Sequence, residues 1–261
     1  MGKLKIAVLI SGTGSNMKAI VEACKAGVID GEVVVVGSDN SEAKGLEFAK
    51  VEGISTFVVD YELTKKIDMS DPANNELLPA DFDVEEILRK QCLYSNEYLS
   101  VMHRASNARI FFQRRAIAEA RLLSELKKYP YDLLALAGFM YILSPFAINR
   151  INIGGVHRIM NIHPALLPAF PGEHGYEDTF NYGCKVGGCT VHFVDYGEDT
   201  GPIIGQKAYE IYPGDRLDAI KDRGLKKEHE LYPECIQMFA VGRLSIGERK
   251  GRKIVHIAGC L

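Results

Sequence analysis

Three polar side chains in the C-terminal half of the sequence are of the types needed for acyl transfer. Asn161 and His163 lie two residues apart in a predicted strand, residues 158–163, and therefore project from the same face. An amide and a titratable imidazole can together stabilise an oxygen that becomes negative during acyl transfer. Asp199, in a loop beside Gly and Pro, could orient the histidine and accept a proton. Each also has a structural interpretation, as a packed His before a turn or as a turn Asp.

A second candidate site is the loop Ser11–Asn16, between a short apolar run and an amphipathic segment. Gly12 and Gly14 let the backbone approach a ligand closely, and the start of a helix offers free N–H groups and the positive end of its dipole. A phosphate group would fit there. The loop is neither a Walker A loop nor a complete dinucleotide-binding fingerprint, because no Lys follows and a third glycine is missing. A plain tight turn is the alternative.

The elements that position these residues follow from the alternation of apolar runs with amphipathic segments, which is typical of a parallel sheet with crossover helices. Strands are predicted at residues 5–11, 32–37, 56–59, 132–137, 158–163, 189–195 and 203–212. Helices are predicted over residues 17–24 and 42–51 and around 116–123. Another starts at Ser144-Pro145, with Ser as the cap and Pro in the first turn. The last one runs from its cap Asp215 toward Gly242, and Pro233 is expected to kink or split it. We expect ligands beyond the carboxyl ends of the strands.

Residues 62–110 interrupt this alternation. The stretch begins with a polar segment that contains Asp, Asn and Pro and continues with charge-mixed segments that predict helices over residues 84–92 and 96–105. We interpret it as an insertion within a single domain of residues 1–261. His192, in the middle of the strand at 189–195, fits a packed structural histidine and a site histidine equally well.

Composition sets limits on the function. The chain has 261 residues, a formal net charge of −3 and no basic block, so a nucleic-acid partner is not expected. No apolar run is long enough for a transmembrane helix, and the first run is too short for a signal peptide, so we expect a cytoplasmic protein without a membrane partner. The six cysteines form no CxxC pair and have no zinc spacing, which favours free thiols and no metal.

Five segments in this order resemble the glycinamide ribonucleotide formyltransferase family: ISGTGSN, LAGFMYILSP, MNIHPALLPAFPG, GCTVHFVDYGEDTGPIIGQ and KEHELYP. The resemblance covers residues 4–61 and about 111–245. It implies an α/β fold with a doubly wound, mostly parallel, Rossmann-like sheet. It also implies transfer of a formyl group from the co-substrate 10-formyltetrahydrofolate to the amine of glycinamide ribonucleotide, a step of purine biosynthesis, without a metal.

The resemblance implies a role for each matching residue. Asn161, His163 and Asp199 would be catalytic, with the first two stabilising the oxyanion and Asp199 favouring protonated His163. The substrate phosphate and ribose would be held by Gly12, Thr13, Gly14, Ser15, Asn16 and Glu228. The folate would be bound by Arg115, Met140, Tyr141, Ile142, Leu143, Asp195, Tyr196, Gly197 and Glu198.

The sequence departs from this family in several places. Tyr141 stands where an arginine is common, Leu225 where a polar phosphate contact is sometimes found, and Ala169 where Lys or Ser is common. The insertion is expected to be a mostly helical flap that covers part of the rim of the folate side or docks on a second subunit of a homodimer. The equal alternative is a surface addition with no effect on catalysis. Three alternatives are methionyl-tRNA formyltransferase, which would have a basic C-terminal domain, formyltetrahydrofolate deformylase, which would have an added N-terminal domain, and a silent binding module.

Overall fold

The computed structural model describes residues 2–259. Its main sheet has seven strands in the order β3-β2-β1-β4-β5-β6-β7. Pairing is parallel from β3 through β5, and β5–β6 and β6–β7 are antiparallel. The strands are β1 Leu4–Ile10, β2 Gly31–Ser38, β3 Ser55–Val58, β4 Leu133–Leu136, β5 Ile159–His163, β6 Val186–Phe193 and β7 Ile203–Glu210. The predicted mostly parallel α/β sheet is confirmed.

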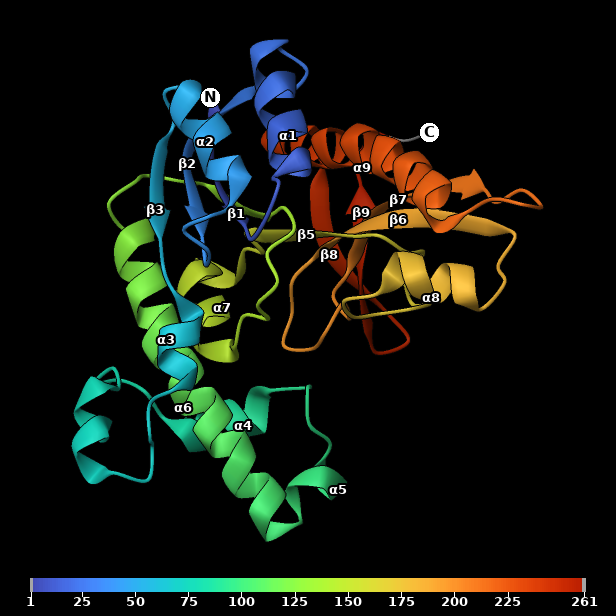
Figure 1. Ribbon diagram of the computed structural model, residues 1–261. Coiled ribbons are helices and arrows are strands. Elements are labelled where there is room, and N and C mark those ends of the chain that lie inside the picture. The colour runs from blue at the N-terminus through green and yellow to red at the C-terminus, as the bar shows by residue number, and fades with distance from the viewer. Residues whose placement is uncertain (1, 260–261) are drawn as a thin grey trace.

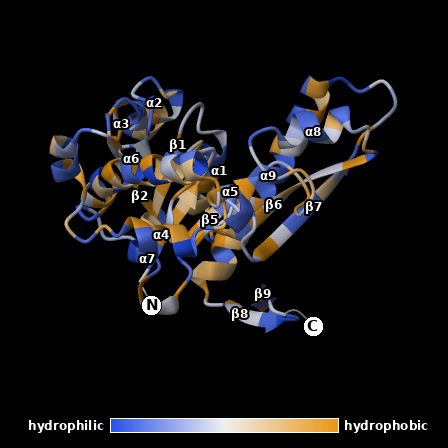
Figure 2. Ribbon diagram, turned by 90° about the horizontal axis from the view of Figure 1, so that it is seen from below, coloured by the Kyte–Doolittle hydropathy of each residue, from blue (hydrophilic) through white to orange (hydrophobic). Residues whose placement is uncertain are grey.

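Helices cover both faces of this sheet (Figure 1). Strand β1 shows why, because its side chains alternate between two separate hydrophobic cores. Ile6 and Val8 pack with α1 (Ser15–Lys25), α2 (Lys44–Val51) and α9 (Leu217–Ala240). Ala7 and Leu9 pack on the other side with α6 (Met102–Leu126) and α7 (Pro145–Ile151). Figure 2 shows the hydrophobic character of the strands between these layers.

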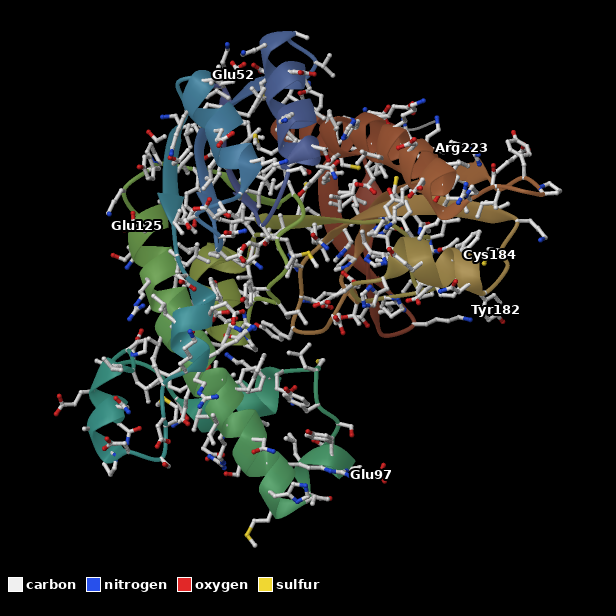
Figure 3. All side chains as sticks on the ribbon, viewed as in Figure 1. Glu52, Glu97, Glu125, Tyr182, Cys184 and Arg223 are labelled. Atoms are coloured by element: carbon white, nitrogen blue, oxygen red, sulfur yellow. The ribbon has the colours of Figure 1, made fainter. Side chains whose placement is uncertain are left out.

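The insertion projects from the body of the sheet (Figure 1). It contains α3 (Tyr61–Lys65), a 3₁₀ segment η1 (Pro72–Leu77), α4 (Val84–Lys90), α5 (Asn96–Leu99) and the start of α6. Figure 3 shows Glu97 at its outer tip. The predicted helix over 84–92 is confirmed in position, but the one over 96–105 is wrong as a single helix. It is interrupted because the Ser100 side chain donates to the Glu97 carbonyl (2.7 Å) and Val101 caps α6 in an extended conformation.

The C-terminal region departs furthest from the predictions. Asp215 does not cap the last helix. Its carboxylate instead accepts a hydrogen bond from the Tyr212 amide (2.7 Å) and pairs with Arg223 (2.9 Å), and Arg216 is the N-cap. The helix also runs through Pro233 as one element. Elements that were not predicted include α8 (Gly175–Asn181) and the hairpin of β8 (Leu244–Arg249) and β9 (Arg252–Ile257), which forms a second sheet.

The cysteines within residues 2–259 are free thiols, namely Cys24, Cys92, Cys184, Cys189 and Cys235. Figure 3 shows Cys184 beside Tyr182 at the end of α8. Cys260 lies outside the described residues. No helix within residues 2–259 combines the length and apolar character needed to cross a membrane.

Candidate active site

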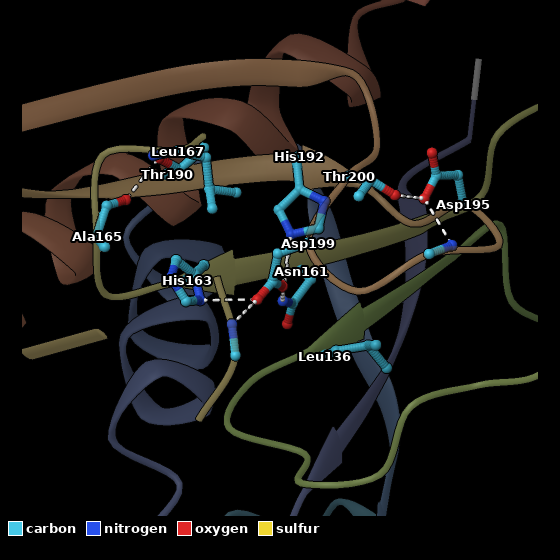
Figure 4. A network of polar contacts seen from close by, with 12 residues as sticks. Leu136, Asn161, His163, Ala165, Leu167, Thr190, His192, Asp195, Asp199 and Thr200 are labelled. Carbon is cyan, nitrogen blue, oxygen red and sulfur yellow. Dashed lines mark hydrogen bonds and ion pairs between the residues drawn. The ribbon is translucent and has the colours of Figure 1, made fainter. Parts of the chain in front are cut away.

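The three residues predicted to be catalytic meet at the carboxyl end of β5 (Figure 4). Asn161 and His163 point from β5 toward Asp199, which lies in the loop between β6 and β7. The Asp199 carboxylate is 3.1 Å from His163 Nδ1 and accepts a hydrogen bond from the Asn161 amide at 3.4 Å. The i, i+2 spacing on the strand therefore places both donors at one carboxylate, as the pattern predicted.

The surroundings of Asp199 favour its ionised form. Burial alone would raise its pKa, but hydrogen bonds from His163 and His192 outweigh burial and lower the pKa well below the usual range. The Gly172 amide adds a further hydrogen bond to the carboxylate, at 2.9 Å. The backbone of Asp199 is left-handed, with φ of 51°, a conformation that is uncommon for non-glycine residues.

His163 has an acceptor at each ring nitrogen. Nδ1 faces the Asp199 carboxylate, and Nε2 is 2.7 Å from the carbonyl oxygen of Phe170. Nε2 therefore lies where it can donate to a negatively charged oxygen that replaces the Phe170 carbonyl.

His192 is a further member of this cluster. It sits on β6 directly opposite Asn161 in the antiparallel register, and its side chain is 3% exposed. Its Nδ1 is 2.9 Å from the Phe193 carbonyl, while Nε2 lies 3.3 Å from the Asn161 amide nitrogen and 3.4 Å from Asp199. The sequence left its role open, because the pairing of β5 with β6, which places His192 opposite Asn161, cannot be read from the sequence.

At one end of the cleft, the loop Ser11–Asn16 leads into α1. Gly14 adopts φ of 66°, and a Cβ there would lie 2.9 Å from the Met17 side chain and 3.1 Å from Gly45, so both conformation and space require glycine. The N-terminus of α1 has no side-chain cap. Within the described part of the chain, the amides of Ser15 and Asn16 form no hydrogen bond. This arrangement suits an anion.

Glu228 closes the same end from α9. Its carboxylate accepts hydrogen bonds from the Asn16 side-chain amide, at 2.6 Å, and from the Tyr176 hydroxyl. Burial raises the pKa of Glu228, and these two hydrogen bonds oppose the rise. Tyr176, on α8, was absent from the sequence predictions because no motif marks it. It fits against Gly224, where a Cβ would lie 2.3 Å from the tyrosine ring.

Another part of the cleft wall is formed by the turn 138–143, which touches the loop Ser11–Asn16 because the Met140 amide donates to the Ser11 hydroxyl at 2.9 Å. Ser144 caps α7 as predicted, and its side chain accepts from the Phe146 amide at 3.2 Å. Glu119, which is fully buried on α6, binds Ser144 through its carboxylate. It accepts from the Ser144 amide (2.6 Å) and hydroxyl (2.5 Å). Burial raises the pKa of Glu119 to about 7 against these hydrogen bonds. The turn is therefore fixed to α6 through one carboxylate.

Tyr141 and Arg115 form an aromatic-cationic wall at this end. The Tyr141 ring stacks on Tyr61 at 4.4 Å, and the Arg115 guanidinium lies 4.8 Å from Tyr141 and 5.1 Å from Phe111. The position where an arginine is common in the family is thus occupied by a ring that packs against another arginine.

Two residues that precede Asp199, Asp195 and Tyr196, anchor the loop that carries it. Asp195 accepts from the Gly197 amide (3.1 Å) and the Thr200 hydroxyl (2.6 Å). Tyr196 donates to the Asn149 side chain at 2.5 Å, and its carbonyl accepts from the Cys92 amide at 2.9 Å. The side chains of Asp195 and Tyr196 therefore hold the loop, and neither residue lines the cleft. Residues 197–199 of the same loop do line it.

The residues that line the site surround one cleft of about 710 Å³. It runs from the loop Ser11–Asn16, past the catalytic cluster, to the wall formed by Tyr141 and Arg115. Leu225 lines it, so the departure noted there falls inside the site. Lining residues that the sequence analysis missed include Lys65, Phe111 and Tyr176. Within residues 2–259, no group of three or more His, Cys, Asp or Glu side chains is placed to hold a metal ion.

Comparisons with known proteins agree with this geometry. A family model described as "Formyl transferase" matches residues 4–236. The chain is 34% identical over 245 residues to phosphoribosylglycinamide formyltransferase of Escherichia coli (strain K12), covering 94% of this chain and 91% of that protein. It is 32% identical over 245 residues to the enzyme of that name from Bacillus subtilis (strain 168), covering 94% and 98%.

A solved structure gives the same result. Glycinamide ribonucleotide transformylase 1 from Symbiobacterium toebii superposes with a TM-score of 0.71 at 35% identity, covering 98% of this chain and 94% of that one. The family inferred from the five sequence segments is therefore confirmed. The chain belongs to the formyl transferase family, among its phosphoribosylglycinamide formyltransferases.

Proposed function

We propose that this protein transfers the formyl group of 10-formyltetrahydrofolate to the amine of glycinamide ribonucleotide. The observation that carries the proposal is the layout of the cleft. A helix N-terminus with unpaired amides lies at one end, and a cluster of Asn161, His163 and Asp199 lies between it and an aromatic wall. An anionic amine substrate and a flat aromatic donor fit the two ends, and their reacting atoms meet at the cluster.

The reaction forms one C–N bond and breaks another. The substrate amine attacks the formyl carbon, and the former carbonyl oxygen becomes negative. Asn161 and the Nε2–H group of His163 stabilise this oxygen, which takes the position of the Phe170 carbonyl at Nε2. The bond from the formyl carbon to N10 of the folate then breaks, and the proton lost by the amine is delivered to N10.

Asp199 has a mainly electrostatic role in this scheme. A carboxylate whose pKa is lowered is a weak base, so Asp199 can pass the amine proton onward, through water, without storing it. Its carboxylate lies 3.1 Å from Nδ1 and keeps His163 oriented. His192 supports the same carboxylate from β6 and fixes the Asn161 amide at 3.3 Å.

We assign the ends of the cleft accordingly. The substrate phosphate binds at the amides of Gly14 to Asn16, with Glu228 near the ribose. The folate ring binds along Met140 to Leu143 and Gly197 to Asp199, with Arg115 facing it. Because Glu228 is buried and would repel a second anion beside it, its carboxylate is suited to accept hydrogen bonds from the neutral ribose hydroxyl groups.

We further propose that residues 1–261 form one domain into which residues 62–110 are inserted. Three contacts support this: the Cys92 amide binds the Tyr196 carbonyl, Phe82 packs on Phe146 with ring centroids 5.8 Å apart, and Arg150 pairs with Asp81 at 2.5 Å. The insertion thus lies against α7 and the Asp199 loop, on the folate side of the cleft.

An acceptor assay tests the proposed function. Purified protein is given 10-formyltetrahydrofolate with or without glycinamide ribonucleotide, and formylated ribonucleotide and free formate are both measured. We expect formylated ribonucleotide to appear in step with tetrahydrofolate. Release of formate at the same rate with and without the ribonucleotide would identify a deformylase instead.

A further inference from the structure

The Tyr176 side chain joins α8 to α9 at the end of the cleft where the substrate phosphate is expected. The two helices pack against each other (Figure 1). The Tyr176 hydroxyl donates to Oε1 of Glu228, while the Asn16 side-chain amide donates to Oε2 at 2.6 Å. All three residues line the cleft. One carboxylate on α9 is therefore held by donors from two other helices, one donor to each oxygen.

The tyrosine ring fits into a gap that a glycine leaves on α9. Gly224 lies one helical turn before Glu228, and a Cβ there would lie 2.3 Å from the Tyr176 ring. Glycine is a poor helix former, and Gly224 has an ordinary helical conformation, so space for the ring is what requires it. The ring is thus fixed against α9 with its hydroxyl at Glu228.

The Tyr176 hydroxyl also affects the protonation of Glu228. Burial and the neighbouring Glu228 charge raise the pKa of Tyr176 well above its usual range, so the phenol remains a donor. Burial raises the pKa of Glu228 as well, and the hydrogen bond from Tyr176 is the largest effect that opposes this rise. Without that hydroxyl, Glu228 would take up a proton more readily, and one acceptor oxygen would become a donor.

This part of the cleft offers acceptors to a ligand. Each Glu228 oxygen accepts one hydrogen bond from the protein and can accept another. Oδ1 of Asn16 is buried and has no hydrogen-bond partner within the described part of the chain. Buried acceptors without donors are unfavourable, and neighbouring hydroxyl groups of a sugar would supply the donors.

We propose that Tyr176 is a positioning residue that determines specificity, because it holds the Glu228 carboxylate as an acceptor for the ribose hydroxyl groups of the substrate. This inference rests on the proposed function. Tyr176 acts through Glu228 and needs no contact of its own with the sugar. A substrate with the same phosphate and amine, but with no hydroxyl groups at the 2′ and 3′ positions, should therefore gain nothing from Tyr176.

Tyr176→Phe tests this, because it removes the hydroxyl and keeps the ring on Gly224. We expect the Kd of glycinamide ribonucleotide to rise roughly tenfold, the value of a hydrogen bond to a charged group, and the Kd of its 2′,3′-dideoxy analogue to stay unchanged. Tyr182→Phe is the matched control, since Tyr182 ends the same helix, is exposed and does not line the cleft. An equal loss of affinity for both ligands, or the same loss in the control, would overturn the proposal.

The pH dependence separates positioning from packing. The titratable groups that interact with Glu228 are Tyr176 on α8, His163 on β5, Tyr209 on β7 and Cys189 on β6. Burial raises the pKa of Tyr209 and of Cys189 to about 12, so both stay neutral near pH 7. Loss of the Tyr176 hydroxyl should raise the pKa of Glu228, so the ratio of variant to wild-type Kd should fall from about pH 6 to about pH 9. A ratio that does not change with pH would contradict the positioning role.

Gly224→Ala disturbs the same contact from α9, because its methyl group would displace the Tyr176 ring. Alanine favours a helix, so the variant should fold. We expect a similar loss of affinity for the ribonucleotide, and little further loss when Gly224→Ala is combined with Tyr176→Phe. Losses that multiply in the double variant would show that ring packing matters and the hydroxyl does not.

Calorimetric measurement of Kd needs no formyl transfer, so it separates this inference from the proposed function. A preference for the ribonucleotide that depends on Tyr176, in a protein that transfers no formyl group, would reject the proposed function and keep the role of Tyr176. Normal formyl transfer with a preference that ignores Tyr176→Phe would do the reverse.

Discussion

The two ends of the cleft are built in different ways. The phosphate end consists of regular elements: the amides at the start of α1, and Glu228 on α9 with its two donors. The folate end consists of turns and loops that are held by distant residues, such as Glu119 behind Ser144 and Cys92 behind Tyr196. One end is therefore built from helices that contact one another, whereas the other consists of turns and loops whose positions depend on side-chain and backbone contacts that include the insertion.

The largest effect is expected at the cluster between the two ends. His163→Ala should lower kcat roughly 10²–10³-fold, because it removes a donor to the oxyanion. The KM values for both substrates should change little, since neither end of the cleft is altered. Steady-state kinetics with circular dichroism as a folding control measures this, and near-normal turnover in a folded variant would refute the mechanism.

The phosphate end should respond separately from the folate end. Asn16→Ala removes the side-chain amide that binds Glu228 at 2.6 Å and disturbs the start of α1. We expect the KM for glycinamide ribonucleotide to rise roughly 10- to 100-fold, the value of a hydrogen bond to a charged group, with an unchanged folate KM. A matching rise in the folate KM would show that the two ends are not independent.

The folate end should respond to a residue that does not touch the folate. Glu119→Gln keeps the shape of the side chain and removes one of the two oxygens that accept hydrogen bonds from Ser144. We expect the folate KM to rise several-fold, with little change in kcat or in the KM for the ribonucleotide. Glu119→Asp should restore part of the effect, because the carboxylate is retained. An unchanged folate KM would remove Glu119 from the positioning of the turn.

The same residue has a defined effect on stability. The pKa of Glu119 is about 7 in the folded protein and 4.5 in the reference state, so the unfolded chain loses its proton first as pH rises. This contribution to stability is full below about pH 4.5 and is lost as pH rises through 7. Relative to wild type, Glu119→Gln should therefore gain roughly 3 kcal/mol in unfolding free energy between about pH 4.5 and pH 8. Denaturant titrations at several pH values would measure it, and a pH-independent difference would contradict the buried, ionisable state of Glu119.

The smallest effect is expected where the insertion packs on the body. Phe82→Ala removes a half-buried ring that contacts Phe146 and should lower the unfolding free energy by roughly 1–2 kcal/mol. Glu97→Gln, at the exposed tip, is the control and should change nothing. If both variants unfold at the wild-type urea concentration, the insertion is not docked through Phe82.

Some parts of the cleft could be located from the sequence and others could not, for physical reasons. The Gly12–Asn16 loop and the Asn161–His163 pair depend on local rules: glycine conformation, the start of a helix and the two-residue repeat of a strand. Glu119, Tyr176 and His192 depend on which elements become neighbours, and no local pattern marks such a contact. The β8–β9 hairpin was missed because its charged residues hid the alternating pattern of a strand. The role of Asp215 was missed because its carboxylate pairs with Arg223 and does not cap the helix.

Both substrates should occupy the one cleft and meet at Asn161, His163 and Asp199. A crystal structure with glycinamide ribonucleotide and a folate that lacks a transferable formyl group would show whether they do. We predict the phosphate at the amides of Ser15 and Asn16, the folate ring against residues 140–143, and the amine beside Asp199 and His163. A phosphate bound away from α1, or an amine far from this cluster, would rule out the proposed arrangement.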